Sequence, residues 1–424
     1  MSIQKEIPKL VEAKVISQST ADDILTYYAN QKQPTQNRLL SIFGTLGAIM
    51  VGLGIILIIA HNWDQFPRSI KATFAILPLV IGQFACGFTL LRKQTSQSWR
   101  EASSAFLFFA IGSCISLISQ IYNIPGQLGS FLFIWMILYL PIPFLMRSSV
   151  GSILFIVGSL FYALNIGYWE YPNTIPYWYI LFIAASILFY LIQKKENPAG
   201  NSVAIHSWLI PLSITICLRA FSKNHEEIMF LAYMSLFGVF ASIGKQVSFS
   251  QLTPASNGFK IIAWLGSIIV LLILSFDAVW IDIRRNSYEF PTLLQSTEVY
   301  ATILLTTIAL ILAKINWTKS KAGFSESLFF VLLLIYITAS HTSFAYILVN
   351  LLVFAFGIVT IVSGNREQNL GILNSGLVII TALIICRFFD TDLSFVLRGI
   401  LFLSIGFGFF IANYQLLKKR KHHA

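Results

Sequence analysis

Long apolar runs, separated by short polar connections, extend along almost the whole chain. From residue 40 onward, apolar runs of roughly 18 or more residues recur, which is the length that an α-helix needs to cross a bilayer. The pattern predicts fourteen spans, at 40–60, 71–91, 103–122, 128–146, 149–168, 176–193, 203–220, 227–244, 259–281, 298–315, 325–340, 343–363, 370–389 and 393–414. The predicted fold is therefore an all-α, polytopic integral membrane protein with about fourteen transmembrane helices.

Residues 1–37 are the only sizeable segment with the polarity of a soluble protein. Leu10 and Val11 begin an apolar pattern at helical spacing, and Ser19 and Thr20 predict the N-cap of a second helix. We expect a short cytoplasmic helical hairpin that packs against the protein or docks a partner. A DNA-binding role is disfavoured, because two short helices lack the third that a stable unit needs and the charges of the segment nearly cancel.

The composition supports a membrane protein. Of the 424 residues, 56% are hydrophobic and 11% are charged, and the mean hydropathy is +0.74. Soluble domains carry roughly 25% charged residues, so this chain has too few charges to cover a surface in water. The net charge of +11 would point to nucleic acid in a soluble protein. In a membrane protein, Lys and Arg retained on the cytoplasmic side explain it, so the predicted partner is the lipid bilayer and not a nucleic acid.

The basic residues predict the orientation of the helices, because cytoplasmic connections carry an excess of Lys and Arg. With the N-terminus inside, most of the 29 Lys and Arg residues fall in the cytoplasm. The acidic residues divide about evenly, so the bias belongs to the cations alone. An even number of helices also places the basic tail 418–421 inside, and both termini are therefore predicted to be cytoplasmic. The basic residues left outside are Arg68, Lys71, Arg219, Lys223, Arg284, Arg285, Arg387 and Arg398.

In this orientation, costly polar side chains gather toward the outer end of the helices. The first outer connection holds a dense polar stretch at 61–68, Gln120 ends the third span, and Arg387 and Arg398 bracket the last outer connection. Intramembrane charges normally face protein or water. The inner half offers only His206, Asn350 and Asn374. The asymmetry predicts an outward-facing ligand site formed by Asn62, Asp64, Arg68, Gln120, Arg387, Asp390 and Arg398.

A purely structural interpretation of the same residues stays open. Arg387, Asp390 and Arg398 can pair with one another, together with Asp392, and Asp64 and Arg68 have the i, i+4 spacing of a local ion pair. Prolines inside the predicted spans indicate kinks or broken helices, which either shape the bundle or line a cavity: Pro78, Pro141, Pro143 and Pro211. A face of small residues in the first span predicts a close helix contact: Gly44, Ala48 and Gly52.

The sequence contains none of the motifs that mark a catalytic or cofactor site. It has no H-E-x-x-H, no G-x-S-x-G and no Walker sequence. The four cysteines lie in apolar runs without C-x-x-C spacing and predict neither disulfides nor metal ligands. We therefore expect no metal and no cofactor. Asp64 would suit a membrane transferase that uses a lipid-linked donor, but its connection is too short to hold an acceptor.

Three motifs stand out in the N-terminal third. They are L-V-E-A-K-V-I-S at 10–17 followed by A-D-D-I-L, I-A-H-N-W-D at 59–64 followed by Pro-Arg, and S-Q-I-Y at 119–122. With these motifs, the N-terminal third resembles the bacterial membrane proteins of domain-of-unknown-function family 2157. The family typically has A-x-N-W and G-Q-x-Y, so Ser119 departs from the pattern. The resemblance, over roughly 5–150, implies a bacterial inner-membrane protein with a small membrane-anchored operon partner of the G-D-Y-x-x-L-x-Y type. It implies no activity.

We expect three regions: the hairpin at 1–37, a family-like membrane region at 38–150, and a C-terminal membrane region at 151–424. The leading functional hypothesis is a transporter-like or flippase-like protein that acts on a small molecule or lipid through the outward-facing polar site. The first alternative is a non-catalytic envelope scaffold or assembly protein whose outer residues and hairpin bind partner proteins. The second alternative is a membrane-embedded transferase.

Alkaline phosphatase fused after Gln65 tests the orientation. Because the first outer connection is predicted to face outward, the fused enzyme should be exported and active, whereas β-galactosidase fused at the same residue should be inactive. Enzyme activity in intact bacterial cells is the measurement. An inactive phosphatase at Gln65, with an active one after Gln94 in the next connection, would reverse the predicted orientation.

Overall fold

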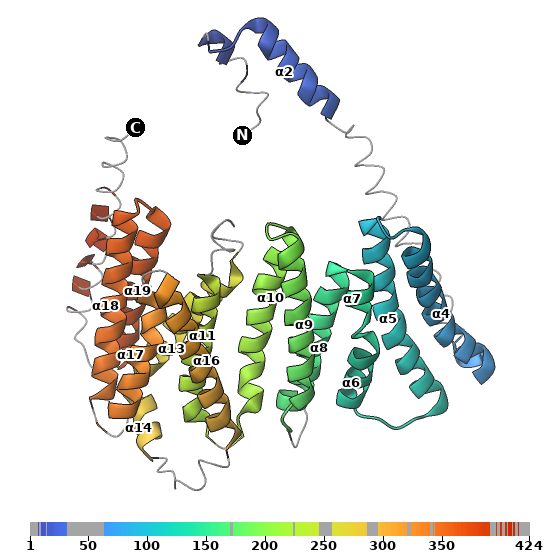
Figure 1. The fold of residues 1–424 in the computed structure, drawn as a ribbon. Coiled ribbons are helices and arrows are strands. Elements are labelled where there is room, and N and C mark those ends of the chain that lie inside the picture. Colours follow the sequence, from blue (N-terminus) through green and yellow to red (C-terminus); the bar gives the residue numbers. More distant parts are fainter. Residues whose placement is uncertain are drawn as a thin grey trace. The chain divides into compact units, whose positions relative to one another are not determined.

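The structure is a computed structural model that describes residues 63–169, 173–223, 225–245, 257–285, 296–319, 324–339 and 344–390, together with residues 7, 10–13, 15–31, 342 and isolated positions between 396 and 414. The regular secondary structure of these residues is entirely helical, as the apolar pattern predicts (Figure 1). Residue contacts divide the chain into two units, Met1–Phe74 and Ala75–Ala424.

The first unit contains helix α2 (Gln18–Gln31) and the short 3-10 helix η1 (Trp63–Gln65). Ser17 caps α2, because its Oγ accepts a hydrogen bond of 3.2 Å from the backbone N–H of Thr20. The predicted caps Ser19 and Thr20 are therefore wrong, and both residues lie inside the first turn. The helix begins earlier than predicted because the Ser17 hydroxyl already supplies the missing acceptor.

The predicted first span at 40–60, with its face of small residues, lies outside the described residues. The link between α2 and that span also lies outside them. The hairpin as a whole therefore stays a prediction.

The remaining helices follow in chain order, and α4 begins just before the boundary between the two units. They are α4 (Arg68–Arg92), α5 (Gln97–Tyr122), α6 (Leu128–Tyr139), α7 (Ile142–Met146), α8 (Ser149–Leu164), the π-helical turn η2 (Asn165–Trp169), α9 (Tyr177–Glu196), α10 (Asn201–Leu218), η3 (Arg219–Phe221), η4 (Glu226–Ile228), α11 (Met229–Gly244), α13 (Gly258–Leu274), α14 (Asp277–Arg285), α16 (Thr297–Lys319), α17 (Phe324–Ala339), α18 (Ala345–Arg366) and α19 (Leu370–Asp390).

Within the described part of the chain, nine helical segments are long and apolar enough to cross a membrane. The bent pair α13–α14 makes a tenth if it counts as one span. Two shorter apolar helices, Met229–Gly244 and Leu328–Thr338, coincide with further predicted spans. Most of the predicted last span, 393–414, lies outside the described residues. The total of about fourteen therefore stays a prediction.

The helices of the second unit pack mainly against their neighbours in the chain. Helix α8 packs against α5, α6, α9 and α10, α11 packs against α13, α16 and α17, and α18 packs against α13, α17 and α19. Large apolar side chains remain exposed on the outer faces; Phe84 is 75% exposed and Leu91 is 82% exposed. Water would make such surfaces an aggregation hazard, whereas lipid covers them without cost.

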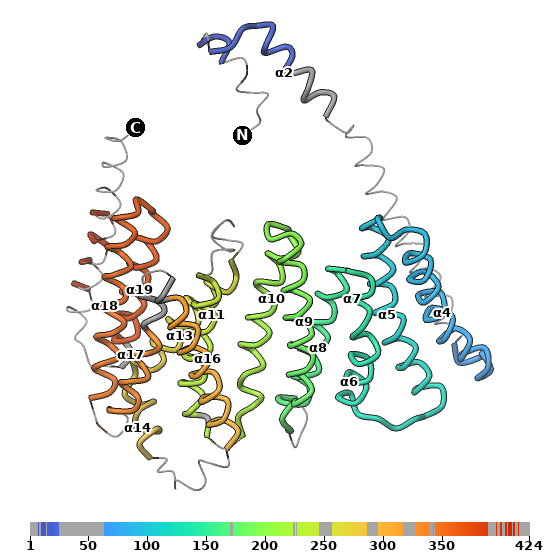
Figure 2. The backbone as a smooth tube through the Cα atoms, in the orientation of Figure 1, coloured from blue at the N-terminus to red at the C-terminus, as the bar shows by residue number. Residues whose placement is uncertain are grey.

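The sharpest break in the described helices lies where the sequence predicts one continuous span, 259–281. Helix α13 ends at Leu274, and α14 then leaves at an angle of 75°. Figure 2 shows this change of direction in the backbone. The break contains no proline. Among the predicted proline kinks, Pro141 separates α6 from α7, whereas Pro78 and Pro211 lie inside helices that continue without interruption.

Glycines allow α18 and α19 to approach closely. A Cβ at Gly376 would lie 2.7 Å from the backbone nitrogen of Ile361, and a Cβ at Gly364 would collide with the backbone of Leu373. Neither contact can be relieved by moving a flexible side chain, because the opposing atoms belong to the other helix's backbone. Small residues therefore fix the spacing of this helix pair.

Replacing Gly376 by Ala should destabilise the α18–α19 pair, because the added methyl group overpacks a backbone contact. We expect a loss of about 1–3 kcal/mol, measured as a lower melting temperature of the detergent-solubilised protein. Gly87→Ala is the matched control, since no atom lies within 4 Å of a Cβ there. Equal melting temperatures for the two variants would contradict the close packing.

Candidate functional site

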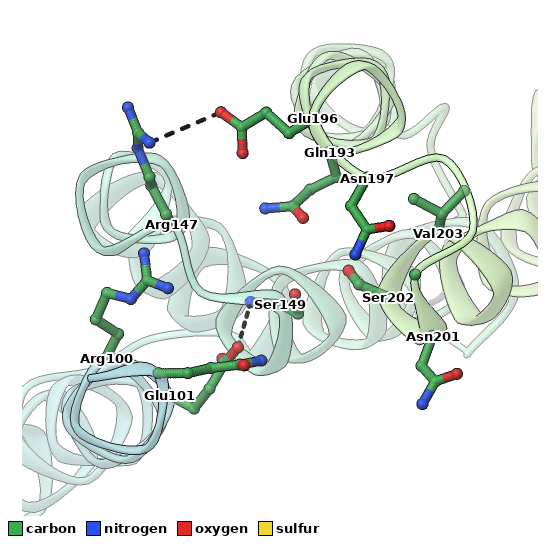
Figure 3. Close-up of a pocket in the computed structure, with 12 residues that line it drawn as sticks. Arg100, Glu101, Arg147, Ser149, Gln193, Glu196, Asn197, Asn201, Ser202 and Val203 are labelled. Carbon is green, nitrogen blue, oxygen red and sulfur yellow. Dashed lines mark hydrogen bonds and ion pairs between the residues drawn. The ribbon is translucent and has the colours of Figure 1, made fainter. Parts of the chain in front are cut away.

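A polar cavity of about 510 Å³ lies where four helices begin or end (Figure 3). Its lining comes from the first turn of α5, the α7–α8 connection, the last turn of α9 and the first turn of α10. A second cavity of about 360 Å³ adjoins it and shares Arg100 and Arg147. The volume of the larger cavity falls within the range of small-molecule sites, and its lining is mostly polar.

Local sequence features end the helices at this cavity. Arg147 adopts the left-handed conformation (φ 47°), which stops α7 and turns the chain so that α8 can start at Ser149. Helix α9 ends at Glu196, and Pro198 follows two residues later, where a proline cannot continue the helix. Gly200 then occupies the N-cap of α10 without a side-chain hydrogen bond. The helix ends therefore bring their polar side chains to one place.

Glu101 on α5 caps the N-terminus of α8. Its carboxylate accepts hydrogen bonds from the backbone N–H groups of Ser149 (3.1 Å) and Val150 (2.9 Å), and from the hydroxyl of Ser148. The Ser148 hydroxyl in turn accepts from the N–H of Gly151 at 2.9 Å. A negative charge is favourable at the positive end of a helix. Glu101 therefore joins α5 to α8 and has a structural partner for its charge.

The two arginines of the cavity differ in their partners. Arg147 lies 3.7 Å from the carboxylate of Glu196, but both side chains are exposed (68% and 48%), so this ion pair contributes little to stability. Arg100 is half-buried, and its Nε is buried without a hydrogen bond to any described residue. In Figure 3 the Arg100 side chain from α5 and the Gln193 side chain from α9 extend toward the same open space.

A second polar cluster stabilises the break between α13 and α14. The break interrupts the helical hydrogen bonding, and other side chains replace the missing partners. The carbonyl of Leu274 accepts from Trp280 Nε1 at 2.7 Å, and that of Ser275 accepts from Asn350 Nδ2 at 3.0 Å. The Ser275 hydroxyl donates back to the carbonyl of Leu272 at 2.6 Å. A serine that bonds its own backbone in this way favours the end of a helix.

Arg387, one of the predicted site residues, reaches this break from α19. Its Nη2 donates to the buried Ser275 Oγ at 3.2 Å, and its guanidinium lies 5.0 Å from the centre of the Phe276 ring. Asn350 lies at the same level. The prediction that Asn350 and Arg387 lie in opposite halves of the membrane is therefore wrong, because both contact Ser275 at the end of α13. The break therefore gathers intramembrane polar groups from three helices.

The other predicted site residues are not brought together by the described residues. Asp64 and Arg68 are exposed and form no ion pair with each other. Gln120 is exposed near the end of α5, at the opposite end of that helix from the cavity. Helix α5 packs against α6, α7 and α8, whereas α19, which carries Arg387, packs against α13 and α18. Asn62, Arg398 and the side chain of Asp390 lie outside the described residues. None of the seven lines either cavity.

Sequence reasoning missed two carboxylates with structural roles, Glu101 and Glu298. Buried Glu298, at the start of α16, accepts hydrogen bonds from the backbone N–H groups of Lys223 and His225, the latter at 3.2 Å. It thereby holds the connection that follows α10. One feature of the sequence could have indicated the cavity, namely the dense run of amide and charged side chains at 193–202. No group of three or more His, Cys, Asp or Glu in the described ranges is placed to hold a metal ion.

The described chain has several apolar helices of membrane-crossing length, and their outer faces expose large apolar side chains. A polar cavity lies at the ends of four of the helices. These features are those of a multi-pass membrane protein. Residues 8–152 match the model of the family described as "Predicted membrane protein (DUF2157)". The match covers the N-terminal third, where the sequence resemblance lies, and includes Arg100, Glu101 and Arg147. No curated protein and no solved structure matches the chain.

Glu101→Ala should destabilise the protein, because the N–H groups of Ser149 and Val150 lose their acceptor. The expected loss is about 1–3 kcal/mol, measured by thermal unfolding in detergent. Glu196→Gln is the matched control: it removes a carboxylate from the same cavity, but one in an exposed ion pair worth about 0–1 kcal/mol. If the Glu101 variant melts no lower than the Glu196 variant, the carboxylate does not hold α8.

Proposed function

We propose that this protein is transporter-like or flippase-like and that the break between α13 and α14 is the part through which it acts on its solute. The observation that carries the proposal is the 75° break itself, which the half-buried polar side chains of Asn350 and Arg387 contact from two other helices. Broken helices at polar positions are a recurrent feature of transporter sites, where unwound backbone contacts the substrate.

The energetic cost of this break supports a functional role. In hydrocarbon, each backbone group without a partner costs several kcal/mol, so an irregular backbone persists only where protein or a water-filled cavity supplies partners. A continuous helix over 259–281 would need neither Asn350 nor Arg387. The chain instead places a guanidinium and an amide where the backbone is interrupted, and intramembrane ionisable groups commonly line solute pathways.

A hydrogen bond also connects α14 to the segment that follows α17. Arg284 forms an ion pair of 3.3 Å with Asp277 inside the same helix, and its Nη1 donates a hydrogen bond of 2.9 Å to the carbonyl of Thr342. Thr342 belongs to the connection between α17 and α18. Because the break separates α14 from α13, a tilt of α14 about the break would open this hydrogen bond and uncover the buried side chains of Trp280 and Ile283. Helix α14 is therefore the proposed gate of the site.

The predicted orientation places this site on the outside, because α13 runs outward in that scheme. Asp390 and Arg398 follow Arg387 in the same outer connection and complete the proposed C-terminal part of the site. Asn62, Asp64, Arg68 and Gln120 are proposed ligand contacts on sequence grounds alone. The proposed location is the bacterial inner membrane with cytoplasmic termini, and the small membrane-anchored operon partner remains a proposed partner.

Liposome reconstitution tests the proposal with nitrobenzoxadiazole-labelled phosphatidylglycerol and phosphatidylethanolamine, whose movement between leaflets is followed by dithionite quenching. In parallel, mass spectrometry identifies small molecules that copurify with the protein. The wild-type protein should move a labelled lipid or retain a solute. Arg387→Gln should reduce that signal roughly tenfold, because one charged hydrogen bond is lost.

Arg366→Gln is the matched control, since Arg366 is an exposed arginine in the last turn of the neighbouring helix α18. It should leave the signal unchanged. No lipid movement and no retained solute in the wild-type protein would contradict a transporter and favour the scaffold alternative. An equal loss in both variants would contradict the role of the break.

A further inference from the structure

The cavity between α5, α8, α9 and α10 contains polar groups that the described residues leave unsatisfied. Arg100 Nε and Ser202 Oγ are both buried and make no hydrogen bond within the described part of the chain. Both residues line the same cavity. Buried polar atoms in folded proteins nearly always have a partner, so two such atoms beside one cavity point to an absent polar ligand.

The start of α10 adds further donors. In an α-helix the first N–H groups lack partners inside the helix, and here the N-cap Gly200 has no side chain to replace them. The first-turn residues Asn201, Ser202 and Val203 line the cavity. The positive N-terminal end of the eighteen-residue helix α10 therefore lies beside the cavity that Arg100 also lines. A helix N-terminus and a guanidinium beside one cavity together favour binding of an anion.

The charges of the lining also favour an anion. The lining contains two arginines and two glutamates, but the carboxylate of Glu101 is already engaged by the N-terminus of α8. Glu196 meets Arg147 only through a long, exposed contact of 3.7 Å, which a more highly charged group can displace. Arg100 has no carboxylate partner among the described residues, so its guanidinium is available to an anion in the cavity.

We propose that this cavity binds a phosphate group through Arg100 and Arg147, with the first turn of α10 as a third donor. Guanidinium groups bind phosphate oxygens in pairs, and a tetrahedral phosphate can accept from three directions where a planar carboxylate cannot. The cavity volume of about 510 Å³ exceeds that of a phosphate alone, so the phosphate belongs to a larger molecule. Its source is either the headgroup of an anionic phospholipid or a soluble phosphate compound.

The phosphate site is independent of the proposed transport function. It lies on α5 and α7–α10, whereas the proposed solute pathway lies on α13, α14, α18 and α19. Variants of Arg100 can therefore lose phosphate without changing the transport signal, and variants of Arg387 can do the reverse.

Native mass spectrometry of the detergent-solubilised full-length protein measures the lipid arm, with phosphatidylglycerol compared against phosphatidylcholine. Thermal shift titration with inorganic phosphate and with glycerol 3-phosphate measures the soluble arm. Arg100→Gln and Arg147→Gln should each weaken binding of the preferred probe by about tenfold. Arg100→Lys should give an intermediate loss, since it keeps the charge and loses the paired donors.

Two further variants separate binding from folding. Arg92→Gln is the matched control, because Arg92 is an exposed arginine at the end of α4 and lines neither cavity. It should bind like the wild-type protein. Glu196→Gln should tighten binding severalfold, because it releases Arg147 from a competing carboxylate. A gain of affinity cannot come from misfolding.

Preference for phosphatidylglycerol without a phosphate shift assigns the site to a lipid headgroup, and a saturable shift with the soluble probes assigns it to a soluble phosphate compound. Either result supports the proposal. Equal retention of both lipids together with no phosphate shift in the wild-type protein overturns it. So does a loss in Arg92→Gln as large as that in Arg100→Gln.

Discussion

A backbone inside hydrocarbon must find a partner for each N–H and C=O group, and the rest of this structure depends on that requirement. Regular helices satisfy it along most of the described chain. Where a helix is interrupted or begins, a side chain from another helix takes over. Asn350 and Trp280 do so at the α13–α14 break, Glu101 does so at the start of α8, and Glu298 does so beyond the end of α10.

The starts of α8 and α10 and the break near Ser275 differ in how far their polar groups find partners. At α8, Glu101 and the Ser148 hydroxyl close the N-terminus, and the result is structural. At α10, the N-cap is a glycine, and Arg100 and Ser202 beside it keep buried unpaired atoms. The break near Ser275 lies between these extremes. Its backbone carbonyls at Leu274 and Ser275 have partners, whereas Asn350 Oδ1 beside it is buried without a hydrogen bond in the described part of the chain. The proposed phosphate site and the proposed gate follow from this difference.

Several helices follow directly from local sequence. The predicted spans at 71–91 and 370–389 lie within α4 and α19, because an apolar run of the right length is a local property of the chain. The break inside 259–281 was missed for the opposite reason. The residues that stabilise it, Asn350 and Arg387, lie 75 and 112 positions away from Ser275 in the chain. No proline marks it. Polar residues do begin at Asp277, but such a rise in polarity also marks the ordinary end of a membrane span.

By itself, the sequence determined that this is a helical membrane protein, because the composition and the length of the apolar runs depend on whether lipid or water surrounds the helices. Its motifs also determined the resemblance of the N-terminal third. Only the tertiary structure decided which polar residues meet. Arg100 and Arg147 were interpreted as cations of separate cytoplasmic connections, yet helix ends far apart in the chain bring them to one cavity. Gln120 and Arg387, predicted to share a site, lie on helices with different packing neighbours. The packing of the helices decides which polar residues meet, and the apolar pattern along the chain does not determine that packing.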